Sequence, residues 1–232
     1  FHTGDEVSFN CRIYFFESAE IPSFFKYFTS VRKDFGNDIL PAELPFSSAW
    51  NILEKKYNAQ NWVPTYGYYS VGMRESTYQD WQTGWVGGMN AVYPLLVNGN
   101  DSTRQRAMQT FDFLFDTISP SGLFYEVFYD GEWKLTNKSS FLRRNSDALY
   151  FIMKSFDEIK NKQPDFVFPD KWINAVKGCA DVYLNLWNQY GEFGQMVDFN
   201  TGGLTASGTC SNGIACGVLA LCSQFFNNKQ YL

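Results

Sequence analysis

The sequence predicts an all-α fold, an (α/α) toroid of helical hairpins in which about seven helices form an incomplete ring behind a short N-terminal β segment. Two observations carry this prediction. After residue 18, apolar side chains recur with the spacing that is typical of helices. Between pairs of helices, the chain returns to loops rich in glycine and aromatic residues, around Gly67, Gly122 and Gly191. This weak internal repeat favours stacked hairpins.

The N-terminal segment differs from the rest of the chain. Residues 5–17 alternate in part and are rich in β-forming side chains, so we expect a strand there. It would end an upstream β domain or lie on the helical body. We therefore assign residues 1–18 to this segment and residues 19–232 to the toroid domain, which we expect to be truncated at its C-terminus.

The helices are placed by periodicity and by end signals. Pro22 falls in the first turn of the first helix, Asp101 or Ser102 is expected to cap the fourth, Asp170 the sixth, and Gly191 to end the sixth. The helix after each loop is the more apolar, so it should line an inner ring, with amphipathic helices outside. The inner helices would then begin at one mouth, together with the loops. The expected helices cover residues 19–35, 48–59, 83–98, 102–118, 143–161, 171–190 and 210–226.

The segments between helices carry turn signals. Residues 61–82 are aromatic and contain glycine, and we expect them to be extended or hairpin-like. The same holds for residues 121–135, where Asp130-Gly131 predicts a tight turn.

Composition excludes several kinds of function. The net charge of −5 and the lack of a basic run argue against nucleic acid as a partner. No apolar run reaches the roughly 18 residues of a transmembrane helix, so no membrane partner is expected. The single histidine, His2, argues against a Ser-His-Asp triad and a histidine-built metal site. The five cysteines are interpreted as small apolar residues. We expect no metal and no cofactor, and the compartment stays undecided, secreted and periplasmic locations included.

Several segments resemble those of one superfamily. They are QDWQTGWVGG (79–88), SGLFYEVFYDGEW (121–133), RRNSDAL (143–149), GEFGQMVDFNTG (191–202) and ALCSQFFNNKQYL (220–232). In layout and style they are similar to the six-hairpin glycosidases, the (α/α)6 toroids of many carbohydrate hydrolases and lyases. The resemblance implies a toroid fold and carbohydrate chemistry, without matching one family's catalytic pattern. Because the chain has fewer helices than six hairpins require, we expect a fragment, or a ring closed by its missing remainder or by a second copy.

Two acidic residues are the first catalytic candidates, because glycoside hydrolysis needs two carboxylates across the scissile bond. Asp80 is flanked by aromatic residues, which would raise its pKa toward that of a general acid, but it is also well placed to cap a helix. Asp147 is a candidate base or substrate clamp, and the alternative for it is an ion pair with Arg143, four residues earlier.

Two further acids belong to this set. Glu126 lies in an aromatic loop of alternating pattern, so the sequence leaves its direction undecided. Glu192 follows a helix end, where a carboxylate opposes the dipole, and such an unfavourable position is a mild sign of function. Asp198, in contrast, precedes a turn-like run, and its expected role is in that turn.

Residues near these acids could bind substrate. Trp81, Trp85, Tyr125 and Phe193 could stack on sugar rings, with core packing as the alternative for each. Arg144 and Gln195 could bond hydroxyl or carboxylate groups.

Three functions compete. The first is a carbohydrate-active enzyme, a glycoside hydrolase that uses carboxylates as acid and base on an oligosaccharide or polysaccharide. The second is a glycan-binding module without a competent acid pair. The third is a helical scaffold that binds a protein partner, for which an exposed apolar patch would speak.

Overall fold

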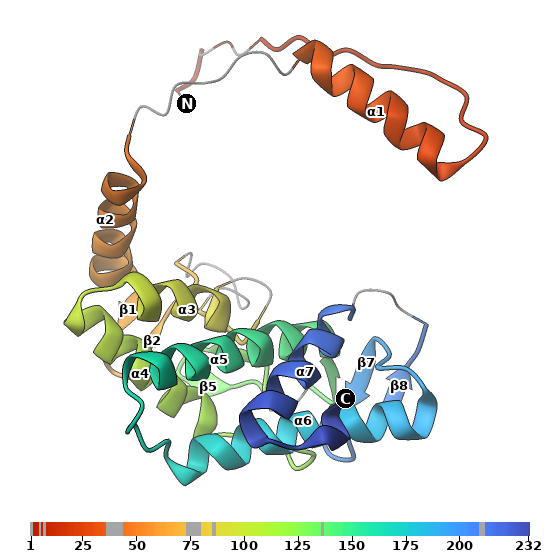
Figure 1. Ribbon diagram of the computed structural model, residues 1–232. Helices are drawn as coiled ribbons and strands as arrows, with labels where there is room; N and C mark the ends of the chain where they lie inside the picture. Colours follow the sequence, from red (N-terminus) through yellow and green to blue (C-terminus); the bar gives the residue numbers. More distant parts are fainter. Residues whose placement is uncertain are drawn as a thin grey trace. The chain divides into compact units, whose positions relative to one another are not determined.

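The computed structural model describes residues 2–4, 6, 8–35, 44–72, 80–84, 87–135, 137–208 and 212–232. The chain forms two compact units, Phe1–Pro45 and Phe46–Leu232 (Figure 1). The predicted boundary after residue 18 falls inside the first unit, so the first helix groups with the N-terminal segment. Among the described residues, no helix has the length and apolarity needed to cross a membrane.

The first unit contains one described helix, α1 (Ile21–Phe35), with Pro22 in its first turn as predicted. The strand predicted over 5–17 is wrong for the described part of that range, because residues 8–18 form no regular element and pair with no described strand. One of their aromatic side chains, Phe16, packs on the helix instead. The ring of Phe16 stacks on Tyr27 with centroids 4.7 Å apart and lies 5.8 Å from the ring of Phe24.

The second unit is mostly helical. With α1, its six α-helices make seven in the described part of the chain, the number that the sequence predicts. A π-helix, η1 (Tyr57–Asn61), follows α2 directly, and a 3-10 turn, η2 (Lys229–Tyr231), follows α7. The six helices are α2 (Phe46–Lys56), α3 (Gly88–Asn98), α4 (Asp101–Phe115), α5 (Leu142–Lys162), α6 (Asp170–Tyr190) and α7 (Ile214–Phe226).

Five of these helices form two rows. Helix α5 lies between α3 and α7 and contacts both, while α4 and α6 contact each other in a second row (Figure 1). The rows are joined because α3 packs on α4 and α6 packs on α7. The three helices of the first row are those that follow the glycine-rich loops, and those of the second row precede them.

Short strands pair the loops with one another, a departure from the all-α expectation. They form an antiparallel pair β1-β2 and two antiparallel three-stranded sheets, β3-β4-β5 and β6-β7-β8. The predicted turn at Asp130–Gly131 joins β4 to β5, and Asp130 has a positive φ of 55°. The strands are β1 (Trp62–Val63), β2 (Tyr68–Tyr69), β3 (Trp81–Gln82), β4 (Val127–Tyr129), β5 (Glu132–Trp133), β6 (Ser139–Phe141), β7 (Met196–Asp198) and β8 (Leu204–Ala206).

The core fills the space between the two helix rows. Phe111 of α4, Phe156 of α5 and Trp172 of α6 meet there, with ring centroids 5.0–5.9 Å apart. All three side chains are almost completely buried. Burial of an apolar side chain of this size contributes about 1.5–3 kcal/mol, so these rings hold the rows together.

Two predicted helix caps are wrong. Asn100, rather than Asp101 or Ser102, is the N-cap of α4, and its side chain accepts a hydrogen bond from the Thr103 amide. Asp170 is the first residue of α6, and the preceding Pro169 takes the cap position without a side-chain bond. In both cases a neighbouring residue has the extended backbone that a cap requires. The predicted end of α6 at Gly191 is confirmed, with this glycine in the left-handed conformation.

Candidate functional site

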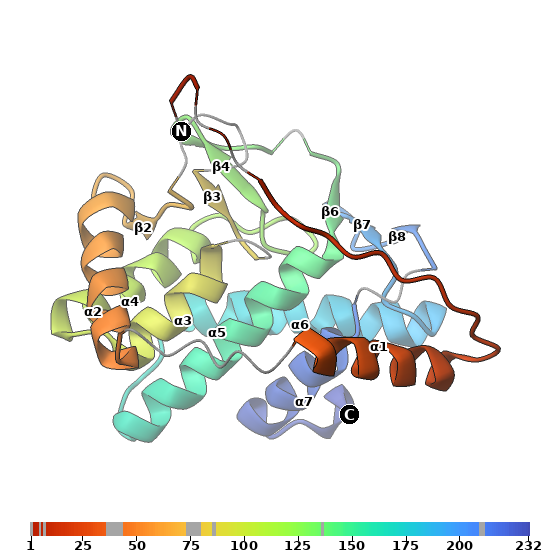
Figure 2. The same ribbon diagram turned by 90° about the horizontal axis from the view of Figure 1, so that it is seen from above.

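The three glycine-rich loops meet beside the first turns of α3, α5 and α7. The ring of Tyr66 in the first loop lies 5.0 Å from that of Phe128 in the second. The Ser121 amide in the second loop donates to the Phe199 carbonyl in the third, over 3.1 Å. Figure 2 shows β3, β4 and β6–β8 together on one side of the helix row α3–α5–α7. We call this meeting place of the loops the loop rim.

The backbone of the first loop touches helix α5 at the loop rim. Gly84 is buried, and a Cβ added to it would collide with the carbonyl oxygen of Arg144. The neighbouring Thr83 amide donates to the Glu126 carbonyl over 3.0 Å. A glycine is therefore required where this loop lies against the first turn of α5.

Glu126 points into the protein at the loop rim. Only 4% of the residue is exposed. The Ser140 hydroxyl donates to its Oε1 over 2.6 Å, and Nη1 of Arg144 donates to its Oε2 over 3.1 Å. Burial raises the pKa of the carboxyl group to about 7, although the hydrogen bond from Ser140 and the charge of Arg144 act in the opposite direction. The group can therefore hold or release a proton near neutral pH.

Asn145 fixes the backbone that carries Glu126. Its side-chain oxygen accepts from the Phe124 amide over 2.8 Å, and its amide nitrogen donates to the Phe124 carbonyl over 3.1 Å. The same nitrogen donates to the Ser140 hydroxyl over 3.0 Å. The buried side chain of Asn145 thus positions both the backbone just before β4 and Ser140, the residue that contacts the carboxyl group of Glu126. Sequence reasoning missed Asn145 and Ser140. The polar run RRNSD at the start of the helix was a usable signal for Asn145, but it does not include Ser140.

Asp147 lies on the same helix and belongs to a second arginine–carboxylate pair. Nε of Arg143 donates to Oδ1 of Asp147 over 2.7 Å, and Asp147 is buried. This is the i,i+4 ion pair that was the alternative for this residue. Consecutive arginines at the start of α5 therefore bind two different carboxylates, Arg143 that of Asp147 and Arg144 that of Glu126.

A buried hydroxyl pair lies near both acids. The hydroxyl groups of Tyr183 and Ser146 are 2.8 Å apart, and Tyr183 donates to the Leu142 carbonyl over 3.1 Å. Burial, foremost, raises the pKa of Tyr183 well above its ordinary value, and the charges of Glu126 and Asp147 add to the rise. Both carboxylates are thus within electrostatic range of one phenol.

The remaining candidate acids lie elsewhere. Asp80 is half-buried before β3, and its carboxylate accepts a long bond of 3.4 Å from the Asp130 amide. Glu192 accepts from the Gly208 amide over 3.0 Å in the third loop. The turn role expected for Asp198 is confirmed, since it accepts two backbone amides and a hydroxyl there, which lower its pKa.

The candidate aromatic residues differ in exposure. Trp81 is fully buried, donates to the Thr83 hydroxyl over 3.2 Å and packs in the core, the alternative considered for it. Tyr125 is half-buried beside Glu126, with its ring 5.0 Å from that of Phe199. Phe193 is half-buried between Tyr183 and Trp187. Two candidates remain: Gln195 is exposed, and Trp85 lies outside the described residues.

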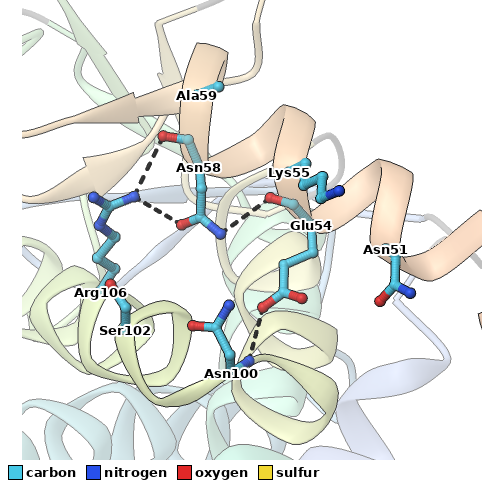
Figure 3. Close-up of a pocket in the computed structure, with 8 residues that line it drawn as sticks. All are labelled: Asn51, Glu54, Lys55, Asn58, Ala59, Asn100, Ser102 and Arg106. Atoms are coloured by element: carbon cyan, nitrogen blue, oxygen red, sulfur yellow. Dashed lines mark hydrogen bonds between the residues drawn. The ribbon is translucent and has the colours of Figure 1, made fainter.

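A separate polar cavity lies between α2 and α4, with a volume of about 800 Å³. Figure 3 shows Glu54 and Asn58 of the α2–η1 segment facing Asn100 and Arg106. The carboxylate of Glu54 accepts a hydrogen bond from the backbone N–H of Asn100 over 2.7 Å, and Nη1 of Arg106 donates to Oδ1 of Asn58 over 2.8 Å. These groups satisfy one another and join α2 to α4, so the cavity wall has a structural role. It contains none of the candidate catalytic residues.

Among the described residues, no group of three or more His, Cys, Asp or Glu side chains is arranged to hold a metal ion. Comparison with protein-family models, with curated proteins and with solved structures finds no match to this chain.

Proposed function

We propose that this chain is a carbohydrate-active enzyme, a glycoside hydrolase, whose two helix rows are part of an α/α toroid of the six-hairpin type. The alternation of a helix in the first row with a helix in the second supports the toroid. The meeting of three glycine-rich loops at the starts of α3, α5 and α7 supports a functional mouth at that end.

Glu126 is the proposed general acid, and its environment is the observation that carries the proposal. A glycosidase acid must be protonated before it meets the leaving oxygen and must give up the proton during the reaction. A carboxyl group with a pKa of about 7 meets both needs near neutral pH. Ser140 and Arg144 bond its two oxygens, so this buried carboxyl group must exchange one of these partners for the leaving oxygen when it transfers its proton.

Asp147 is the proposed second carboxylate. It lies one turn along α5 from the arginine that binds it, and it shares the surroundings of Tyr183 with Glu126. The half-buried ring of Tyr125, next to Glu126 in the chain, is the proposed sugar platform. The substrate is an oligosaccharide or polysaccharide.

The test replaces Glu126 by its uncharged isostere and measures hydrolysis of a panel of polysaccharides. Loss of a general acid lowers the rate by about 100-fold or more, so Glu126→Gln should reduce kcat to that extent. The matched control is Glu132→Gln in the same loop, because that carboxyl group is exposed and forms its ion pair, among the described residues, with Lys134. Wild-type activity in Glu126→Gln would remove the assignment.

One observation favours a non-catalytic glycan-binding module. Both acids are buried and each is bound by an arginine, an arrangement that also stabilises a loop without any chemistry. Saturable glycan binding with no hydrolysis of any polysaccharide in the panel would select this alternative.

A further inference from the structure

A second cleft, away from Glu126, is lined by side-chain amides. It lies between the last turns of α6 and the turn that joins β7 to β8, and its volume is about 430 Å³. Asn185, Asn188 and Gln189 project from α6, and the Thr201–Gly203 turn and Ser121 form the opposite wall. We infer that this amide cleft is a binding site for a neutral carbohydrate.

The chemistry of the lining points to a neutral ligand with many hydroxyl groups. None of the nine described lining residues carries a charge, so nothing there favours an anion or a cation. A primary amide donates two hydrogen bonds and accepts others, which matches hydroxyl groups that do both. Val182 and Leu186 supply an apolar floor, as the C–H face of a sugar ring requires.

The three amides are available for a ligand. In the part of the chain that the structure describes, none of them makes a hydrogen bond to another residue, and all three residues are exposed. They follow one another at positions i, i+3 and i+4, so they share one face of α6.

The opposite wall is rigid before any ligand binds. Asp198 accepts the amides of Asn200 and Thr201, both over 2.8 Å, and this fixes the turn. Gly202 has a φ of +71°, and a Cβ there would lie 3.4 Å from Cβ of Ser121 and 3.6 Å from Val182. A preformed wall reduces the ordering that a ligand would otherwise impose.

The inference is independent of the catalytic assignment, because none of these residues contacts Glu126 or Asp147 in a described bond. A glycan held in this cleft would contact Ser121 of the second loop and the Thr201–Gly203 turn of the third. The site would then retain a polymer beside the loop rim without taking part in its cleavage.

The experiment measures binding of neutral tetrasaccharides by the whole chain with isothermal titration calorimetry. The probes are cellotetraose, mannotetraose, xylotetraose and maltotetraose, with tetragalacturonate as the charged comparison. The test variant is Asn185→Ala/Asn188→Ala/Gln189→Ala. The control is Asn174→Ala, an exposed amide on the same helix that does not line the cleft. Circular dichroism melting checks that both variants are folded.

At least one neutral probe should bind the wild type, and loss of the three amides should weaken it about tenfold or more. The control Asn174→Ala should bind like the wild type, whether or not Glu126 proves to be catalytic. Failure of every neutral probe, unchanged affinity in the triple variant, equal loss in the control, or preference for tetragalacturonate would each overturn the inference. The single variant Gln189→Ala, with a smaller expected loss in the same direction, decides the matter should the triple variant fail to fold.

Discussion

Two polar clusters in the second unit contain the same residue types but differ in burial. The loop rim has Glu126, Arg144 and Asn145, and the α2–α4 cavity has Glu54, Arg106 and Asn58. At the rim the carboxyl group is cut off from water and its pKa rises to about 7. In the cavity Glu54 is only half-buried. Beside it, burial raises the pKa of Tyr69, whose hydroxyl donates to Asn58, to about 12. Similar side chains therefore give a carboxyl group with a pKa near neutral pH in one place and a structural contact in the other.

The largest effect expected from this comparison follows removal of each arginine. At about pH 8, Arg144→Met leaves a charged carboxylate buried without its partner, which should lower the free energy of unfolding by about 3–5 kcal/mol. Arg106→Met in the open cavity should cost about 1 kcal/mol. Urea titration of both variants measures the difference. At about pH 5 the neutral Glu126 should make the Arg144→Met loss smaller, and a loss that does not change with pH would contradict the burial argument.

The next effect is the pH dependence of stability. The pKa of Glu126 is raised from 4.5 to about 7 on folding, so the folded state binds more protons in that window. The stabilisation that this protonated group adds to the free energy of unfolding is present below pH 4.5. It is lost as the pH rises through 7, a change of about 3 kcal/mol. The wild type should therefore lose about 3 kcal/mol of unfolding free energy relative to Glu126→Gln as the pH rises across this window.

The control for that titration is Glu132→Gln. The pKa of the exposed Glu132 carboxyl group is lowered by Lys134, so its contribution is lost only as the pH falls below its ordinary range. The unfolding free energy of this variant should change with pH as that of the wild type does between pH 4.5 and about 7. Parallel curves for Glu126→Gln and the wild type would show that Glu126 is charged in the folded protein across the window.

A smaller effect separates the two asparagines. Asn145→Ala leaves the buried amide and carbonyl of Phe124 without partners, at a cost of about 2–3 kcal/mol. Asn58→Ala should cost about 1 kcal/mol, because water can reach the groups that it leaves. Thermal melts of the two variants at equal pH compare the two losses of stability. An equal loss would mean that water reaches the unpaired groups at the loop rim as easily as those in the cavity.

The smallest effect belongs to Glu54→Gln. Its carboxylate accepts the Asn100 amide and the Thr103 hydroxyl, and a glutamine oxygen can accept both. We expect a loss of about 1 kcal/mol or less and no change in hydrolysis. A large loss of activity in this variant would move the functional site to the cavity.

Helix periodicity was the most dependable signal in the sequence, because it reports which side chains face a core. It predicted seven helices at close to their observed positions, and the glycine that ends α6. The alternation of residues 5–17 was a poorer signal. β-forming side chains specify a strand only when a neighbouring strand completes the hydrogen bonds, and none is described there.

The site was harder to predict for a related reason. Alternation in residues 121–133 could not say which side of the loop faces inward, because a shift of one residue reverses every side chain. The direction of Glu126 depends on the pairing of β4 with β3, and its pKa depends on how closely Ser140 and Arg144 approach. These are contacts between residues distant in sequence, which no local pattern contains.

The close fit of Gly84 against the Arg144 carbonyl has a mechanical consequence. The loop before α3 rests on the same helical turn that sends Arg144 to Glu126. The Thr83 amide of the same loop also donates to the Glu126 carbonyl, so a movement of this loop along α5 would displace the acid relative to the guanidinium group. The pKa of Glu126 therefore depends on how this loop packs on α5, and a ligand that separated the two would change the acidity of the carboxyl group.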